Sequence, residues 1–247
     1  MINIVIPMAG RGSRFFKAGY TLPKPLIYVH KKHMIEVVVD NIAPKQEHRF
    51  IFICQKEHLE KYGMEKILTN ISPGCVVLTV PEVTEGAACT VLVAEKYIDN
   101  DDELMIANCD QYVDIDINNY IAAEKGYDGF IMTMSASDSK WSFIKYDDNK
   151  NVTLLREKEV ISDEATVGIY NFKHGSDFVR GAKEMISQNI RVNNEFYVAP
   201  VYNTLIEHGS KVGFYNIGFE DKGMYGLGIP ADLEKFLMNS ISDKYKQ

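Results

Sequence analysis

The sequence predicts an α/β protein built on a three-layer, mainly parallel, Rossmann-like sheet with a smaller second lobe. Strand-like and helix-like segments alternate through the first half of the chain, as parallel strands joined by crossover helices do. Distinctive polar residues follow several of these strands directly, where open α/β sheets bind ligands. No linker, repeat or low-complexity tract divides the 247 residues. We therefore expect one domain over residues 1–247, with two lobes around one cleft.

The elements of the first half follow from their hydrophobic periodicity. A short β-prone apolar run opens the chain and ends at Pro7, and later apolar runs of similar length alternate with amphipathic segments. Four strands and four helices are expected here. The strands cover 2–6, 49–54, 75–80 and 103–107, and the helices cover 34–42, 57–68, 87–97 and 115–125.

The second half changes character, because strand-like segments now follow one another. Asp147, Asp148 and Asn149 form an evident turn between two of them. We expect these elements to form the second lobe, together with three more helices. The strands cover 129–135, 141–146, 152–156, 166–172 and 212–218, and the helices cover 176–188, 195–208 and 231–240.

The segment from residue 2 to 25, INIVIPMAGRGSRFFKAGYTLPKP, carries the main chemical signal. A strand leads into a loop with Gly10 and Gly12, whose missing Cβ atoms let backbone N–H groups approach phosphate oxygens. Arg11 and Arg14 add planar donors that match such oxygens. Lys24 lies between two prolines that fix its backbone. We interpret the loop as a cradle for a nucleotide triphosphate, the alternative being a tight strand-to-helix turn with solvated arginines.

Two familiar phosphate-binding fingerprints are excluded. The loop lacks the Gly-Lys-Ser/Thr of the P-loop, and Phe15 stands where the Rossmann fingerprint needs its third glycine. The net charge of −7 argues against broad binding to nucleic acids or membrane surfaces. There is no apolar run long enough to span a bilayer and no signal-peptide pattern, so the cytoplasm is the expected compartment. The four cysteines match no zinc spacing, so we expect free thiols.

Two acidic motifs could hold a metal. Asp110 follows an apolar strand in ANCDQ, where a carboxylate suits Mg²⁺, and the alternative is a turn cap. Asp114 and Asp116 form an Asp-x-Asp motif, which many glycosyltransferases use to hold a metal and a sugar nucleotide. Acids are also favoured at a helix N-terminus, and we prefer that reading for this pair because a helical pattern starts there.

Taken together, PMAGRGSR, PKPLI and MIE (Met34–Glu36) resemble the signature of nucleotidyltransferases that activate sugar phosphates and related phosphorylated small molecules. The resemblance extends along nearly the whole chain. It implies an NTP and a phosphorylated small molecule as substrates, Mg²⁺ as cofactor and Asp110 as its ligand; a homo-oligomer is compatible with it. It also implies a nucleotide-binding set made of Met8, Ala9, Gly10, Arg11, Gly12, Ser13, Gly86 and Asn108.

The same resemblance assigns an acceptor site. The Glu157-Lys158 pair matches the family's Glu-Lys, which meets the acceptor and its phosphate, although such a run is otherwise a solvated face. Gly168 would lie beside the acceptor. Glu195 in NNEFY matches a family carboxylate, and its alternative is a helix N-terminal acid. Gly226 stands where many relatives have an Asp that supplies a second protein ligand to the metal. Glu220 or Asp221 could supply that ligand instead.

The resemblance implies that an acceptor phosphate oxygen attacks the α-phosphorus and that pyrophosphate leaves. Arg14 would hold the β and γ phosphates, Lys24 would neutralise charge at the α-phosphorus, and Lys158 would hold the acceptor phosphate. Likeness to short capsule-type members favours CTP and a role in surface polysaccharide precursors. Two alternatives stay open: a metal-dependent glycosyltransferase that uses Asp114 and Asp116, and a non-catalytic nucleotide-binding protein, suggested by Gly226.

Overall fold

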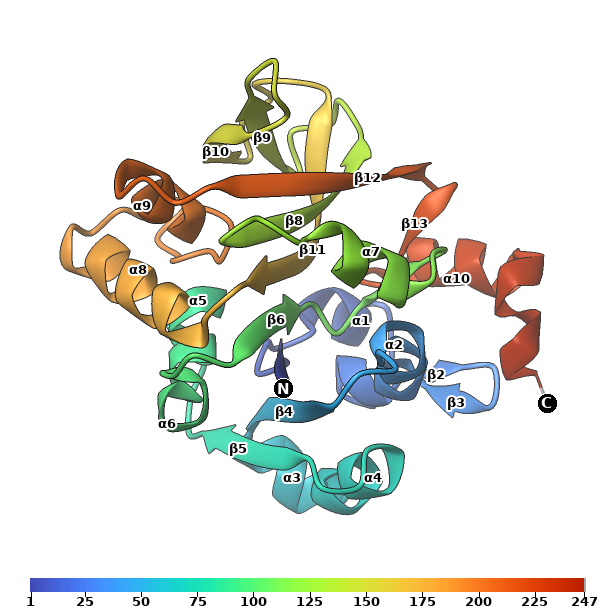
Figure 1. Ribbon diagram of the computed structural model, residues 1–247. Helices are drawn as coiled ribbons and strands as arrows, with labels where there is room; N and C mark the ends of the chain where they lie inside the picture. The colour runs from blue at the N-terminus through green and yellow to red at the C-terminus, as the bar shows by residue number, and fades with distance from the viewer. Residues whose placement is uncertain (247) are drawn as a thin grey trace.

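The computed structural model describes residues 1–246, and within them one large sheet carries helices on both faces (Figure 1). Its strands run in the order β5-β4-β1-β6-β11-β8-β12-β13-β7, with β9 added beside β11 and β10 beside β9. The predicted α/β class is confirmed. The strands are β1 (Ile2–Pro7), β4 (His48–Gln55), β5 (Val76–Val80), β6 (Glu103–Ala107), β7 (Gln111–Val113), β8 (Gly129–Ser135), β9 (Ser142–Tyr146), β10 (Val152–Glu157), β11 (Glu164–Phe172), β12 (Val212–Glu220) and β13 (Gly223–Gly226).

The two faces of the sheet bury alternate residues of each strand. In β1, Ile4 and Ile6 pack on one face and Val5 on the other, as the period of two in a strand requires. Helices α2 (Met34–Ile42), α4 (Met64–Ile71) and α7 (Ile117–Ala123) cover the first face. Helices α5 (Ala87–Leu92), α6 (Glu95–Ile98), α8 (Gly175–Ser187) and α9 (Val201–Glu207) cover the second, giving three layers (Figure 1).

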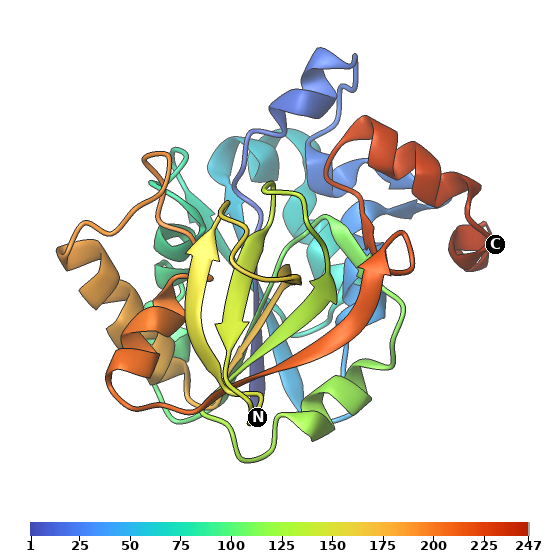
Figure 2. The same ribbon diagram turned by 90° about the horizontal axis from the view of Figure 1, so that it is seen from above.

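The first half of the sheet is parallel and the second half is mixed. Strands β5, β4, β1 and β6 pair in parallel, as expected from crossover connections. Strand β11 then pairs antiparallel with both β6 and β8. The hairpin of β9 and β10 attaches to the N-terminal end of β11, through β9. These later strands form the lobe that stands forward in Figure 2.

Three of the predicted helices are wrong in extent, and one of them, predicted over 195–208, is observed only as α9 (Val201–Glu207). The helix expected over 57–68 is two helices, α3 (Lys56–Tyr62) and α4, because Gly63 between them adopts a left-handed conformation with φ 60°. The helix expected over 87–97 is likewise divided into α5 and α6. The expected turn at 147–149 is present, since the Asp147 carboxylate accepts bonds from the backbone of Asn149 and Asn151.

The C-terminal segment closes the sheet end that carries the opening loop. Helix α10 (Pro230–Met238) and the 3-10 helix η2 (Ser240–Tyr245) lie beside α1 (Ser13–Lys17) and the hairpin of β2 (Tyr28–Val29) and β3 (Lys32–His33), which follows the 3-10 turn η1 (Lys24–Leu26) (Figure 2). An apolar cluster that includes Phe15, Val29 and Phe236 joins these elements. Among residues 1–246, no helix combines the length and the apolar character needed to cross a bilayer.

Candidate active site

The opening loop lies at the carboxyl end of β1 and leads into α1. Gly12 caps the helix in a left-handed conformation, with φ 60°, and a Cβ there would come within 3.3 Å of the Cβ of Lys24. Gln55, at the end of the neighbouring β4, donates a 2.7 Å hydrogen bond from Nε2 to the Ala9 carbonyl and fixes the loop. The strand-to-helix turn and the loop beside a lysine are thus both present.

An open cavity borders this loop between α1 and α3. It measures about 870 Å³ and is lined by Arg11, Ser13 and Gln55, among others. The Arg11 and Ser13 side chains are exposed to it, whereas Met8 and Ala9 are buried beneath the loop. Exposed guanidinium, hydroxyl and backbone N–H groups at the start of a helix are donors suited to phosphate oxygens.

Lys24 and Asp110 meet at the centre of the site, although 86 positions separate them. The Lys24 ammonium donates to Oδ2 of Asp110 at 2.7 Å, and the two side chains are 22% and 23% exposed. Burial alone would lower the pKa of Lys24, but the Asp110 carboxylate outweighs it and raises that pKa, with Arg14 opposing weakly. Lys24 is therefore a fixed cation, and the Gly-rich loop and the Asp110 strand end share one site.

Asp110 offers hard oxygen atoms at a position suited to Mg²⁺, which needs only one or two protein carboxylates when phosphates and water complete its shell. Within residues 1–246, no group of three or more acidic, histidine or cysteine side chains lies ready to hold a metal. Gly228 lets the chain pass close, because a Cβ there would fall 2.7 Å from Oδ2 of Asp110. The residues present therefore fit a metal held jointly with a substrate's phosphates.

A carboxylate that the sequence did not single out lies beside Gly226. A Cβ built on Gly226 would lie 3.2 Å from Oδ2 of Asp232, in the first turn of α10. The two substitutes considered from the sequence are paired with lysines: Glu220 accepts from Lys140 at 2.6 Å, and Asp221 from Lys235 at 3.5 Å. Both carboxylates are also close enough to Asp232 to add to the effect of burial, which raises the pKa of Asp232. Asp232 thus occupies the space into which a side chain at position 226 would project.

A second cavity, of about 300 Å³, brings together most of the residues assigned to the acceptor. Asn108, Glu157, Lys158 and Gly168 all line it. Gly168 has φ 84°, and a Cβ there would lie 2.1 Å from Nδ2 of Asn108, so only glycine fits this floor. The lining also contains Lys140, Trp141, Ser142 and Tyr197, which the sequence did not single out.

Hydrogen bonds hold the two charged groups of this cavity. Lys158 has a left-handed backbone, with φ 58°, and its ammonium donates to the Tyr197 hydroxyl at 2.7 Å. That bond raises the pKa of Lys158 and keeps it charged. The Ser142 hydroxyl donates to the Glu157 carboxylate, whose pKa burial raises and this bond lowers. The cavity therefore presents a cation and a carboxylate side by side.

Glu195 does not begin a helix, so that alternative is wrong. It lies in a tight turn bridged to Val192, and α9 starts only at Val201, after its N-cap Pro200. Asn193 and Asn194, with φ 49° and 63°, also interrupt any helix here. Glu195 instead borders a smaller cavity with Glu157 and Tyr197.

Gly86 connects the two halves of the site. It precedes α5 with φ 128°, and a Cβ there would lie 2.5 Å from the backbone N and O of Phe196. The Phe196 N–H donates to the Glu85 carbonyl, and its carbonyl accepts from Ala88. Close backbone packing against the segment around Glu195 therefore requires a glycine at this position.

The Asp-x-Asp motif adopts the structural role that the sequence favoured. Asp116 is the N-cap of α7, and its carboxylate accepts the backbone N–H of Asn118 at 2.9 Å. All four cysteines are free, as expected, and burial raises the pKa of Cys54 to about 12 and that of Cys109 to about 11. None of these groups is placed to act as a reactive thiolate.

The sequence over residues 4–202 matches the model of the nucleotidyl transferase family. The chain belongs to this family. The match confirms the predicted family and enzyme class. The Lys24–Asp110 centre lies within the matched residues, whereas Gly226 and Asp232 lie beyond them.

Individual relatives agree with this placement. The bifunctional proteins GlmU of Methanococcus maripaludis and Methanococcus aeolicus are each 24% identical, over 98% and 70% of this chain. The chain spans 56% and 40% of their respective lengths. A nucleoside-diphosphate-sugar pyrophosphorylase from Vibrio cholerae RC9 is 28% identical, with a TM-score of 0.81, 96% of this chain and 100% of the other being covered.

Proposed function

We propose that the protein transfers a nucleoside monophosphate from an NTP to a phosphorylated sugar or a related small-molecule phosphate and releases pyrophosphate. The observation that carries this proposal is the Lys24–Asp110 contact at 2.7 Å, between the Gly-rich loop and the cavity of Glu157 and Lys158. The names of the relatives, which include a nucleoside-diphosphate-sugar pyrophosphorylase, support the substrate class.

In this proposal the chain acts by positioning and by neutralising charge. A phosphate monoester oxygen is already ionised near neutral pH, so its in-line attack on the α-phosphorus needs no general base. Lys24 stabilises the charge that develops on the α-phosphoryl oxygens. Arg14 and the loop N–H groups hold the departing β and γ phosphates, and Lys158 holds the acceptor phosphate.

Mg²⁺ would be held by Asp110, together with the substrate's phosphates, and would supply further charge neutralisation. Met8, Ala9, Gly10, Arg11, Gly12 and Ser13, with Gly86 and Asn108, form the proposed nucleotide side. Glu157, Gly168 and Glu195 form the acceptor side. We also propose CTP as the nucleotide and a role in making precursors of surface polysaccharides. The basis for both is the resemblance to short members of the family.

The capping role of Asp116 on α7 weighs against the rival glycosyltransferase, which would need both Asp114 and Asp116 for a metal. A panel that measures pyrophosphate release tests the proposal, pairing each NTP with sugar 1-phosphates, phosphocholine and other phosphorylated alcohols or amides. One pair should give measurable turnover. Lys24→Met should lower that turnover by roughly 10²-fold or more, and Lys66→Ala, a change of an exposed lysine on α4, should leave it unchanged. NTP binding without pyrophosphate release from any pair would instead support the non-catalytic alternative.

A further inference from the structure

Tyr197 stands between two cavities on the acceptor side of the site. It lines the cavity of about 300 Å³ that contains Lys158, and it also lines a smaller cavity of about 140 Å³ beside Glu195. The residue is half-buried, and its hydroxyl accepts the 2.7 Å bond from the Lys158 ammonium. The proposed reaction gives Tyr197 no role, although this residue holds the cation assigned to the acceptor phosphate.

Lys158 by itself is a poorly fixed cation. It follows β10 directly, it is exposed, and its φ of 58° is one that lysine rarely adopts. Its backbone N–H donates to the Trp141 carbonyl at 3.0 Å, so the main chain is anchored. The long side chain beyond it has many rotamers, and ordering them costs free energy whenever the ammonium binds a partner. A bond that exists before the acceptor arrives reduces this cost.

The turn that carries Tyr197 is a firm anchor for such a bond. The neighbouring Phe196 is fully buried; its N–H donates to the Glu85 carbonyl at 2.8 Å, and its carbonyl accepts from Ala88 at 3.0 Å. Arg191 pairs with the Glu85 carboxylate at 3.2 Å, and its guanidinium lies 4.2 Å from the centroid of the Phe196 ring. The phenol is therefore fixed to the segment that precedes α5, on the nucleotide side of the site.

The bond leaves the charge of Lys158 available. Burial raises the pKa of Tyr197, the Lys158 bond lowers it and the Glu195 carboxylate raises it, so the phenol keeps its proton near neutral pH. The Tyr197 bond is also the main cause of the raised pKa of Lys158, and Glu157 and Glu195 act less strongly. A neutral hydroxyl uses a single N–H of the ammonium and cancels none of its charge, so the remaining N–H groups can meet a phosphate.

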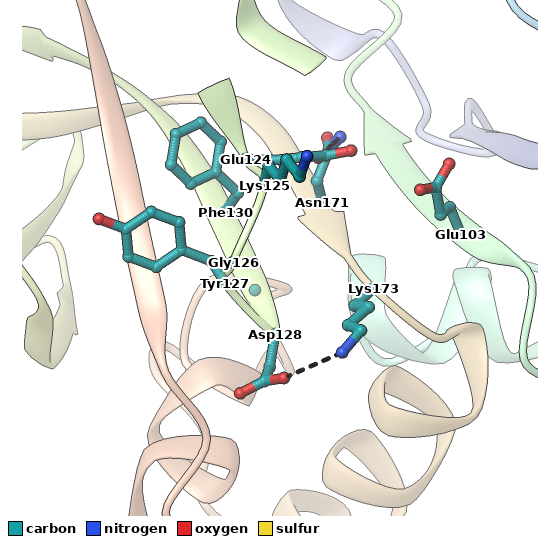
Figure 3. A pocket seen from close by; sticks show the side chains of 10 residues that line it. Glu103, Glu124, Lys125, Gly126, Tyr127, Asp128, Phe130, Asn171 and Lys173 are labelled. Carbon is teal, nitrogen blue, oxygen red and sulfur yellow. Dashed lines mark hydrogen bonds and ion pairs between the residues drawn. The ribbon is translucent and has the colours of Figure 1, made fainter. Parts of the chain in front are cut away.

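A lysine at the C-terminal end of β11 is held differently. Figure 3 shows the cavity there, in which Lys173 lies 3.8 Å from the Asp128 carboxylate, the pair joined by the dashed line. In the same cavity Asn171 donates to Glu124 at 2.7 Å. A carboxylate thus offsets the charge of Lys173, whereas the partner of Lys158 is neutral. Lys158 is therefore the better placed of the two to attract an anion.

We propose that Tyr197 is a positioning residue, whose hydroxyl holds the Lys158 ammonium in place for the phosphate of the acceptor. This inference rests on the proposed function, since it takes Lys158 as the group that binds the acceptor phosphate. A cation ordered in advance binds the acceptor more tightly than a mobile one, because the ordering cost is met on folding. The effect should be confined to the acceptor, since Arg14 and the opening loop hold the phosphates of the NTP.

Steady-state kinetics of Tyr197→Phe test the proposal, with the NTP and acceptor pair found by the pyrophosphate-release panel. The variant keeps the ring and removes only the hydroxyl. The KM for the acceptor should rise roughly tenfold, with kcat and the KM for the NTP nearly unchanged, because binding common to the ground state and the transition state is lost. Tyr215→Phe changes a half-buried tyrosine of β12 that lines neither cavity, and this matched control should keep the wild-type KM values.

A double-mutant cycle separates positioning from a general effect on the fold. Lys158→Met should also raise the KM for the acceptor, and adding Tyr197→Phe to it should change that KM by less than about twofold. Three results would overturn the positioning role: a wild-type acceptor KM in Tyr197→Phe, an equal rise in the KM for the NTP, or additive effects in the double variant. Wild-type protein that releases no pyrophosphate with any pair would instead remove the proposed function, and this inference with it.

Discussion

Replacing Lys24 by Met should move turnover and metal affinity in opposite directions. The change removes the charge and largely keeps the volume of a side chain that is 22% exposed and lies 2.7 Å from Asp110. Turnover should fall by roughly 10²-fold or more, because a preorganised charge at the reacting phosphoryl group is lost. The Asp110 carboxylate, released from its partner, should then bind Mg²⁺ more tightly.

The magnitude of the second effect follows from the geometry of the pair. A unit charge and a divalent cation about 4 Å apart interact by ~8 kcal/mol at an effective dielectric constant near 20, twice the value for two unit charges. Water reaches both groups, which are 22% and 23% exposed, and the phosphates of the NTP offset the charge of the cation, so about a quarter of that energy, ~2 kcal/mol, is a realistic repulsion between Lys24 and Mg²⁺ at Asp110. The dissociation constant for Mg²⁺ should therefore fall by roughly 30-fold.

Pyrophosphate release measures the first effect, and calorimetric titration of Mg²⁺ in the presence of the NTP measures the second. Lys66→Ala should leave both quantities unchanged. Loss of metal binding together with turnover would show that Lys24 supports the fold of the site instead of competing for Asp110. Wild-type turnover in Lys24→Met would refute the catalytic role altogether.

Three further changes test other parts of the structure. Gly168→Ala forces a Cβ to within 2.1 Å of Nδ2 of Asn108 at φ 84°, so urea denaturation should show that the free energy of unfolding falls by about 1–2 kcal/mol. The KM for the acceptor should rise, and the KM for the NTP should not. Asp232→Asn should weaken Mg²⁺ binding by roughly tenfold in calorimetry, whereas Glu234→Gln on the same helix should not, and equal affinities would remove Asp232 from the metal site. The pKa of Glu124 rises from 4.5 to about 7 on folding, so the free energy of unfolding should fall by up to ~3 kcal/mol as the pH rises from below 4.5 through 7. A wild-type pH profile that matches Glu124→Gln in this range would contradict that coupling.

Local sequence signals placed most of the elements correctly, because burial on one or two faces imposes a period on the chain. The helix predicted over 34–42 and the strand over 103–107 have the observed bounds. The errors lie where backbone conformation overrides hydrophobic pattern. Gly63 ends α3 despite a continuous amphipathic pattern, and the left-handed conformations of Asn193 and Asn194 keep Glu195 out of a helix.

The site divides in the same way. The Gly-rich loop, Lys24 and Asp110 could be named from the sequence, because their residue types carry the chemistry and each stands beside a predicted strand or turn. Tyr197, Ser142 and Asp232 could not, because an isolated hydroxyl or acid has no distinctive pattern of its own. Their importance comes from partners far away in the chain, such as Lys158 for Tyr197 and Gly226 for Asp232.

The amino-acid sequence by itself determined the α/β class, the Gly-rich strand-to-helix loop and the family, since these depend on local periodicity and on residues close together in the chain. Only the tertiary structure decided that β11 turns antiparallel, that Lys24 faces Asp110, and that a carboxylate from α10 fills the space at Gly226. Contacts between distant segments depend on how the sheet's strands are ordered, and no short stretch of sequence encodes that order.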